Sequence, residues 1–170
     1  MKIIILGPTG SGKGTQAKFI SRLLKLEHIE IGAILRKEAK RNKLIKDFIK
    51  KGKLIHDDIV IKIIKSKIKS NDFILDGFPR TLKQAKSLKF KPDLVLFLNV
   101  DKKNIVKRLL LRKREDDIKE NIEERDKIYL KKTIPVVNYY NKLKLLKKVN
   151  GNPEIKQVSK NIKKVLEKLI

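Results

Sequence analysis

The sequence contains no cysteine and no tryptophan. The absence of cysteine excludes disulfides, thiolate metal ligands, cysteine nucleophiles and thiol redox chemistry. Long apolar runs are absent too, since none approaches the roughly 20 residues that cross a bilayer. The chain passes from Met1 and Lys2 straight into a short apolar run, without the pattern of a signal peptide. We therefore expect a cytoplasmic protein with no membrane segment.

Acidic residues are scarce as well. The chain has 19 Asp and Glu against 44 Lys and Arg, which gives a formal net charge of +25 at pH 7. Such a charge suits polyanionic partners, either nucleotides or RNA. Much of the excess is lysine in helix-like stretches such as 37–53 and 142–148, where solvated helix faces are the ordinary explanation. Charge alone therefore leaves nucleic acid open as a partner without favouring it.

The 170 residues have the length of one domain. Short apolar runs alternate with longer stretches in which apolar residues recur every three or four positions, which is typical of βαβ units. The pattern predicts an α/β fold, a three-layer sandwich with a five-stranded parallel sheet. The expected strands are 2–6, 28–31, 72–75, 94–99 and 147–150. The expected helices are 13–26, 57–69, 82–88, 102–132, 134–144 and 155–169.

Two further short helices are expected at 33–41 and 43–51. They fall between the second strand and the helix at 57–69, too far from any strand signal to be simple crossovers. We predict that residues 30–55 form a small inserted lobe within a single domain spanning 1–170.

A glycine-rich segment follows the first strand. Residues 7–15 read Gly-Pro-Thr-Gly-Ser-Gly-Lys-Gly-Thr and lead into the first helical stretch, which opens at Lys13. Glycines let successive backbone N–H groups converge on a phosphate, the helix N-terminus adds partial positive charge, and Lys13 supplies an ammonium group. A plain flexible turn is the alternative. The context favours a phosphate-binding loop, or P-loop, for a nucleoside triphosphate.

A second motif ends the third expected strand, where residues 73–81 read Phe-Ile-Leu-Asp-Gly-Phe-Pro-Arg-Thr. Open parallel sheets bind ligands beyond the carboxyl ends of their strands, so Asp76 and Arg80 should face the P-loop. A carboxylate there can orient waters around Mg²⁺, and an arginine can bind a phosphate with two N–H groups. Either residue alone would be explained equally well as a cap or a solvated side chain.

Taken together, the motifs resemble those of the adenylate kinases, in the nucleoside monophosphate kinase family. The resemblance is collinear over nearly the whole chain. It rests on GPTGSGKGTQ at 7–16, IGAILR at 31–36, GKLIHDDIV at 52–60, DGFPRTLKQA at 76–85, RLLLR at 108–112, REDD at 114–117 with Arg125, and TIPVVNYY at 133–140. It implies reversible phosphoryl transfer from Mg·ATP to AMP, giving two ADP, with Mg²⁺ carried by the nucleotide and waters and no direct protein ligand.

The same resemblance implies the residues of the site. For ATP they are Gly10, Ser11, Gly12, Lys13, Gly14, Thr15, Arg108 and Arg112. For AMP they are Ile31, Arg36, Lys53, Leu54, Ile55, Gly77, Phe78, Pro79, Arg80, Gln84, Arg114 and Arg125. Those implied in catalysis are Lys13, Asp76, Arg80, Arg112, Arg114 and Arg125, with Asp76 and Thr15 near the Mg²⁺. The turn at 150–153 resembles one that touches the ATP adenine, although a plain strand-to-helix turn explains it equally well.

Two departures from the family stand out. Ile31 occupies a position where the family usually has threonine, so a hydroxyl near the acceptor base is missing, whereas Gln84 favours adenine. Only Lys113 separates Arg112 from Arg114, so the family's lid is reduced to a vestige at 112–116. We expect a break in the helix near Lys113, a less deeply closed site, and some ATP hydrolysis without an acceptor.

Alternatives remain at this stage. The nearest keeps the fold and changes the acceptor to UMP, CMP or another monophosphate. A different class is a basic RNA- or ribosome-binding factor that uses the P-loop as a switch, although such a factor has no use for arginines on the AMP side. His28 and His56 lack ligand-like partners at metal-binding spacing. The sequence does not indicate an oligomeric state.

Overall fold

The structure is a computed structural model that describes residues 1–112 and 118–169. Arg114, most of the expected vestigial lid at 112–116 and the expected helix break near Lys113 therefore lie outside the described residues. Within the two described ranges, no helix is long and apolar enough to cross a membrane.

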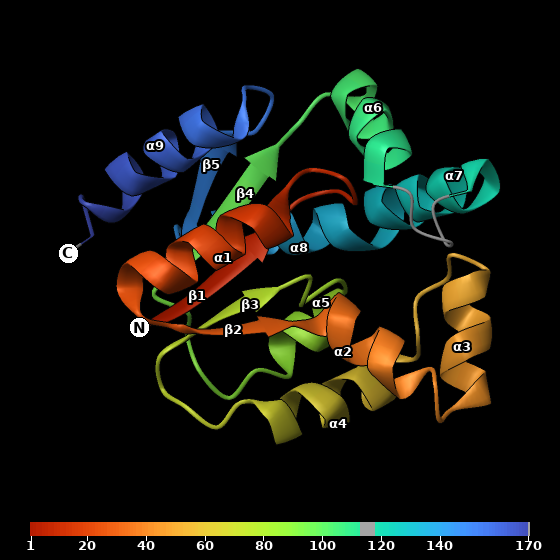
Figure 1. Cartoon of the computed structure of the whole chain (residues 1–170). Coiled ribbons are helices and arrows are strands. Elements are labelled where there is room, and N and C mark those ends of the chain that lie inside the picture. Colours follow the sequence, from red (N-terminus) through yellow and green to blue (C-terminus); the bar gives the residue numbers. More distant parts are fainter. Residues whose placement is uncertain (113–117, 170) are drawn as a thin grey trace.

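A five-stranded parallel sheet forms the centre of the molecule, which confirms the predicted α/β fold (Figure 1). Its strands follow the spatial order β2-β3-β1-β4-β5, and each neighbouring pair is parallel. The strands are β1 (Lys2–Leu6), β2 (Glu27–Glu30), β3 (Phe73–Asp76), β4 (Leu94–Asn99) and β5 (Leu146–Asn150).

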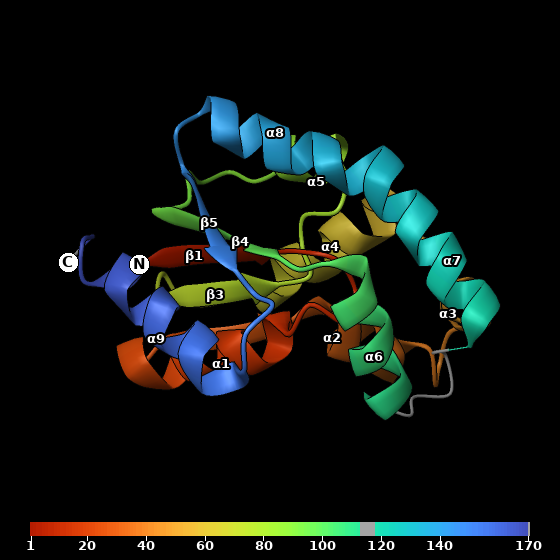
Figure 2. The same ribbon diagram turned by 90° about the horizontal axis from the view of Figure 1, so that it is seen from above.

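Helices cover both faces of the sheet, as Figure 2 shows from above. Their bounds are α1 (Lys13–Leu24), α2 (Ile31–Glu38), α3 (Lys43–Lys50), α4 (Asp57–Lys67), α5 (Leu82–Lys86), α6 (Lys102–Arg112), α7 (Lys119–Ile128), α8 (Ile134–Lys142) and α9 (Ile155–Leu166), with a π-helical turn η1 (Tyr129–Thr133) between α7 and α8. Core contacts place α1 and α9 on one face and α4, α5 and α8 on the other.

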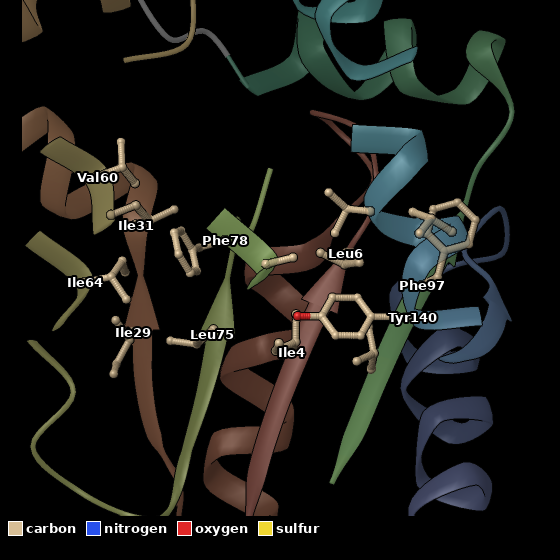
Figure 3. Packing of buried hydrophobic residues seen from close by; sticks show 14 of the residues in the cluster. Ile4, Leu6, Ile29, Ile31, Val60, Ile64, Leu75, Phe78, Phe97 and Tyr140 are labelled. Atoms are coloured by element: carbon tan, nitrogen blue, oxygen red, sulfur yellow. The ribbon is translucent and has the colours of Figure 1, made fainter. Parts of the chain in front are cut away.

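Side chains alternate between the two faces along each strand, so the hydrophobic core has two parts. Ile3 and Ile5 pack towards α1 and α9, whereas Ile4 and Leu6 belong to the cluster that includes α4 and α8. Figure 3 shows part of this second cluster, with Phe78 among its labelled side chains. Strands buried on both faces require continuous apolar runs, which explains why the runs were visible in the sequence.

Several element ends differ from the sequence predictions. The second strand ends at Glu30, and Ile31 is the first residue of α2. Asp76 is the last residue of β3 and does not follow it. The charged side chains of Glu30 and Asp76 therefore lie at the edge of the sheet formed by the carboxyl ends of the parallel strands.

The expected helix at 102–132 is wrong as a single helix, since α7 begins separately at Lys119 and its C-terminal end continues through η1 into α8. Pro135 lies in the first turn of α8. A proline lacks an N–H and its ring clashes with the carbonyl four residues earlier, so a wider π-turn before it relieves both problems.

The lobe expected at 30–55 contains α2 and α3, which pack on each other beyond the carboxyl ends of β2 and β3 (Figure 1). Asn42 caps α3, since its side-chain oxygen accepts a hydrogen bond from the N–H of Ile45 at 3.2 Å. Ile45 and Ile55 are buried in the core cluster of α4 and α8. These contacts attach α3 and the C-terminal end of the segment to the body of the domain.

Candidate active site

The P-loop connects β1 to α1 and has the backbone that the glycines predict. Gly10 and Gly12 have φ angles of +85° and +92°, and Gly12 immediately precedes α1. At Gly10 a side chain would also lack space, because a Cβ atom would lie 2.8 Å from Cγ of Leu109. The loop therefore wraps against α6 and presents the N-terminus of α1 to the cavity.

Lys13 folds back into the loop. Its Nζ donates hydrogen bonds to the carbonyl oxygens of Gly7 and Pro8, both at 2.8 Å. Burial lowers the pKa of Lys13 from 10.5 to about 8; Asp76 raises this pKa, and Arg80 and Arg112 lower it further. The ammonium group is therefore poorly solvated and close to other cations, so a bound phosphate would stabilise its charged form.

Asp76 lies buried beside the start of α1. A Cβ atom at Gly14 would be 3.3 Å from Oδ2 of Asp76, so glycine after Lys13 leaves the carboxylate close to the loop. Nε2 of His28 lies 3.5 Å from the same oxygen. Together with Glu30 these residues offer three ligand-type atoms within 4.8 Å of one another.

This arrangement corrects the expectation that His28 lacks ligand-like partners. Along the sequence His28 and Asp76 are far apart, but β2 and β3 are neighbours in the sheet, with Glu30 in register with Asp76. Side chains two residues apart on one strand share a face, so His28, Glu30 and Asp76 all point to the same side.

Arg80 is fixed by three contacts. Its Nε donates to the carbonyl oxygen of Gly77 at 2.9 Å, its backbone N–H donates to Oε1 of Gln84 at 2.7 Å, and its carbonyl accepts from the hydroxyl of Thr133 at 3.0 Å. Burial lowers the pKa of Arg80; Asp76 raises it, and Arg125 and Arg36 lower it. The guanidinium therefore belongs to a cluster of cations whose mutual repulsion favours an anionic ligand.

Gln84 is held in one orientation. Besides accepting from Arg80, its amide donates through Nε2 to Oδ1 of Asp57 at 2.7 Å. The other carboxylate oxygen of Asp57 accepts from the hydroxyl of Thr81 at 2.8 Å. A primary amide has two N–H donors and two lone pairs on its oxygen. One N–H group and one lone pair of Gln84 therefore remain for hydrogen bonds with a ligand.

Arg108 joins two segments that are far apart in sequence. Its guanidinium donates to the carbonyl oxygen of Ser11 at 3.2 Å and to those of Gly151, Asn152 and Pro153 at 2.8, 3.1 and 3.2 Å. The turn at 150–153 therefore lies beside the P-loop, and Arg108 is the connection between them.

These elements enclose one cavity of about 490 Å³, a size typical of small-molecule sites. The sequence-predicted residues that line it are 10–15, Ile31, Arg36, Lys53, Leu54, Ile55, Asp76, Gly77, Arg80, Gln84, Arg108, Arg112 and Arg125. Pro79 lines a smaller adjoining cavity of about 40 Å³ together with Tyr129. Phe78, only 1% exposed, packs in the core against Ile31 and lines neither cavity (Figure 3).

Sequence reasoning missed Glu30, Gly151 and Pro153 as lining residues, having treated the turn at 150–153 as undecided. For Glu30 a signal was available, since it ends a strand at the edge of the sheet that carries the P-loop. For the turn, the deciding contacts come from Arg108, whose partners its spacing does not reveal.

Comparison with known proteins agrees with this geometry. The family model for adenylate kinase matches residues 5–145. The chain belongs to the adenylate kinase family. An adenylate kinase of Prochlorococcus marinus (strain MIT 9301) is 39% identical, with 95% of this chain and 96% of that protein covered. Relatives from Methanothrix thermoacetophila and Clostridium kluyveri, also named adenylate kinases, are 35% and 34% identical, with 99% and 98% of each chain covered. The chain is therefore a phosphotransferase.

The comparisons also show that this is a short member of the adenylate kinase family. The alignment with the Methanothrix protein spans 213 positions, whereas this chain has 170 residues, so at least 43 residues of that relative have no counterpart here. The alignment with the Prochlorococcus protein spans only 174 positions. The family members that this chain resembles therefore differ in length.

Proposed function

We propose that this chain transfers the terminal phosphoryl group of ATP, bound with Mg²⁺, reversibly to AMP, giving two ADP. The observation that carries the proposal is the convergence of cations on one cavity from two sides. Lys13 and Arg108 come from the P-loop side, and Arg36 comes from α2 on the other side. Arg80 and Arg112 complete the lining. A site for a single nucleotide would not need both sets.

The two sides suit two nucleotides. The backbone of 10–15 and Lys13 would bind the β- and γ-phosphates of ATP, with Arg108 and the turn at 150–153 beside its adenine. Arg36 would bind the phosphate of AMP, and Lys53, Leu54 and Ile55 would line its sugar and base. The transferred group would then move between Lys13 and Arg80, near the middle of the cavity.

The chemistry requires positioning and charge neutralisation more than acid–base catalysis. An oxygen of the AMP phosphate, already largely ionised at neutral pH, attacks the γ-phosphorus, and the bond from that phosphorus to the β-phosphate oxygen breaks. ADP leaves from the P-loop side with the negative charge of the broken bond. Lys13, Arg80, Arg112 and Arg125 would neutralise the charge spread over the transferring group, and Arg114 would join them by family resemblance.

Mg²⁺ would lie near Asp76 and Thr15. Carboxylate and hydroxyl oxygens are suitable donors for Mg²⁺, directly or through its waters. Asp76 is buried at the carboxyl end of β3 and close to the loop, where a carboxylate offsets part of the surrounding positive charge. The ion would neutralise phosphate charge and orient the triphosphate, while the residues named here hold its water shell.

Gln84 supports AMP as the acceptor, because its remaining donor and acceptor match the Watson–Crick edge of adenine. Ile31 offers only an apolar wall; its Cγ2 lies so close to Gly77 that a Cβ atom there would be 3.1 Å away. Acceptance of UMP, CMP or another monophosphate is the second candidate, since no hydroxyl from position 31 helps to distinguish the bases.

Closure of the site would rely on the lobe at 30–55 and not on a separate lid. The side-chain amide of Asn121, in α7, donates to the carbonyl oxygen of Lys50 at 3.0 Å. This contact joins the end of α3 to α7, and Gly52 and Arg125, which follow Lys50 and Asn121 closely in sequence, line the cavity. With 112–116 as a vestigial lid, we expect water to reach the γ-phosphate more often than in longer relatives.

The test is an acceptor panel. The purified chain with Mg·ATP is supplied with AMP, UMP, CMP or no acceptor, and ADP formation is followed. Fast transfer to AMP with slow acceptor-free hydrolysis is expected. Equal rates of transfer to UMP or CMP would show that the enzyme accepts a broader class of nucleoside monophosphates than AMP. No transfer to any monophosphate, combined with salt-sensitive RNA binding, would favour the RNA-binding alternative.

A further inference from the structure

Glu30 forms an ion pair inside the monophosphate half of the cavity. Its Oε1 accepts a hydrogen bond from a terminal nitrogen of Arg36 at 3.0 Å. The side chains of Glu30 and Arg36 are 27% and 37% exposed, and both line the cavity. The proposed ligand of the AMP phosphate is therefore already paired with a carboxylate.

The position of Arg36 explains how the pair forms. Arg36 lies one turn into α2, and its guanidinium folds back over the first turn of the same helix. A Cβ atom at Gly32 would lie 3.1 Å from one terminal nitrogen of Arg36 and 3.7 Å from the other. Glycine at 32 thus leaves room for the guanidinium to reach Glu30, which immediately precedes the helix.

The surroundings of Glu30 are also unfavourable to a phosphate. Glu30 ends β2 in register with Asp76 of β3, and ligand-type atoms of the two side chains and of His28 lie within 4.8 Å of one another. Two carboxylates therefore face the cavity from adjacent strand ends. An incoming phosphate meets the negative charge of Glu30 at the same guanidinium that should attract it.

We propose that Glu30 is a specificity-determining residue that competes with the acceptor phosphate for Arg36 and so sets the affinity for the monophosphate. This proposal rests on the proposed function. AMP binds by displacing the carboxylate from the N–H groups of Arg36, and when the product ADP leaves, the carboxylate takes its place again. Glu30 acts on binding at this end of the cavity and takes no part in the bond exchange.

The test is Glu30→Gln, which keeps the size of the side chain and removes its charge. At saturating Mg·ATP, we expect KM for AMP to fall about three- to tenfold, with KM for ATP unchanged and kcat within about twofold. The change is modest because the ion pair is partly exposed, and it combines the release of Arg36 with the removal of a like charge from beside the phosphate.

Three comparisons make the result specific. Glu27→Gln changes an exposed carboxylate on the same strand and should leave both KM values unchanged. In an Arg36→Met background, Glu30→Gln should lose most of its effect on KM for AMP, because the competition needs the guanidinium. Calorimetric titration with AMP in the absence of ATP should show the same tighter binding. If Glu30→Gln fails to fold, Glu30→Asp, whose shorter side chain weakens the pair, should move KM in the same direction.

An unchanged or higher KM for AMP in Glu30→Gln overturns the proposal. So does a parallel change in both KM values with a lower melting temperature, which would mean that Glu30 only supports the fold. If the unaltered chain itself fails to phosphorylate AMP, the proposed function fails, and that outcome is distinct from an active chain in which Glu30 makes no difference.

Discussion

The buried ammonium group of Lys13 predicts a conflict between stability and activity. Lys13→Met removes a charge that is poorly solvated before nucleotide binds, and it should make the nucleotide-free protein more stable at neutral pH. The same substitution should lower phosphoryl transfer by about 10²- to 10³-fold, because the positive charge beside the transferring group is lost. A residue that costs stability and supports activity is what a preorganised phosphate site requires.

The size of the effect follows from the pKa of Lys13, which falls from 10.5 to about 8 on folding. At about 1.36 kcal/mol per pKa unit, the protonated group costs at most about 3 kcal/mol at pH 7. Because Lys13 is only half-buried and the cavity admits solvent, we expect roughly half of that, about 1.5 kcal/mol. The hydrogen bonds from Lys13 to Gly7 and Pro8 offset part of this cost in the unaltered chain. In the variant those two carbonyl groups can form hydrogen bonds with water instead.

The pH dependence has a definite sign. Between pH 8 and 10.5 the unfolded chain keeps a proton on Lys13 that the folded chain has released. Stability contributed by this group therefore rises with pH across that window, and the advantage of Lys13→Met shrinks there. The advantage of Lys13→Met should therefore be smaller at pH 9.5 than at pH 7.

Urea unfolding of the nucleotide-free proteins at both pH values measures this difference. The net charge of +25 means that every form gains stability as lysines lose protons, so only the difference from the unaltered chain is informative. Lys62→Met, an exposed lysine of α4, is the matched control and should show no such trend. The reasoning is refuted if Lys13→Met is less stable than the unaltered chain at pH 7, or if its advantage does not decline by pH 9.5.

Three further substitutions separate the parts of the site. Gln84→Leu should raise KM for AMP about tenfold and narrow the preference for AMP over UMP; an unchanged acceptor ratio in the panel would remove Gln84 from base recognition. Arg108→Ala should raise KM for ATP about tenfold with KM for AMP unchanged, because the turn at 150–153 loses its connection to Ser11; equal effects on both would contradict separate nucleotide halves. Asn121→Ala should raise acceptor-free ATP hydrolysis relative to transfer to AMP, and a constant ratio would show that the contact with Lys50 does not limit water access.

The centre of the sheet was predictable because β1, β3 and β4 are buried on both faces, and such strands leave continuous apolar runs such as 3–6. The strand ends were less so. Ile31 is apolar and buried, and hydrophobicity alone does not tell the last residue of a strand from the first of a helix. The sequence pattern also separated helices at 132–134, but it did not indicate that a π-helical turn would join them just before Pro135.

In the site, the sequence predicted residues whose place beside the cavity follows from local motifs, but not the pairs that depend on tertiary neighbours. The P-loop places Lys13 by its own backbone, and Arg80 follows from the strand before it. The pairing of His28 with Asp76 depends on β2 lying next to β3, which the order of strands in the sequence does not reveal. Glu30 and Arg36 are close in sequence, but their ion pair depends on the guanidinium folding back over Gly32.

The contact between α3 and α7 bears on the prediction that the lid is reduced to a vestige. Gly52, with a φ angle of +65°, brings the chain after α3 so close to α7 that a Cβ atom there would lie 3.2 Å from the backbone of Asn121. The neighbouring carbonyl of Lys50 then accepts from the amide of Asn121. A hinged lid opens and closes as a unit, whereas this contact is short and belongs to two elements that also line the cavity. If nucleotide exchange on the AMP side moves α3 away from α7, this contact must break. A site built in this way should release products readily and exclude water less completely. We therefore expect the short form to show more acceptor-free ATP hydrolysis, with little decrease in the turnover rate for phosphoryl transfer.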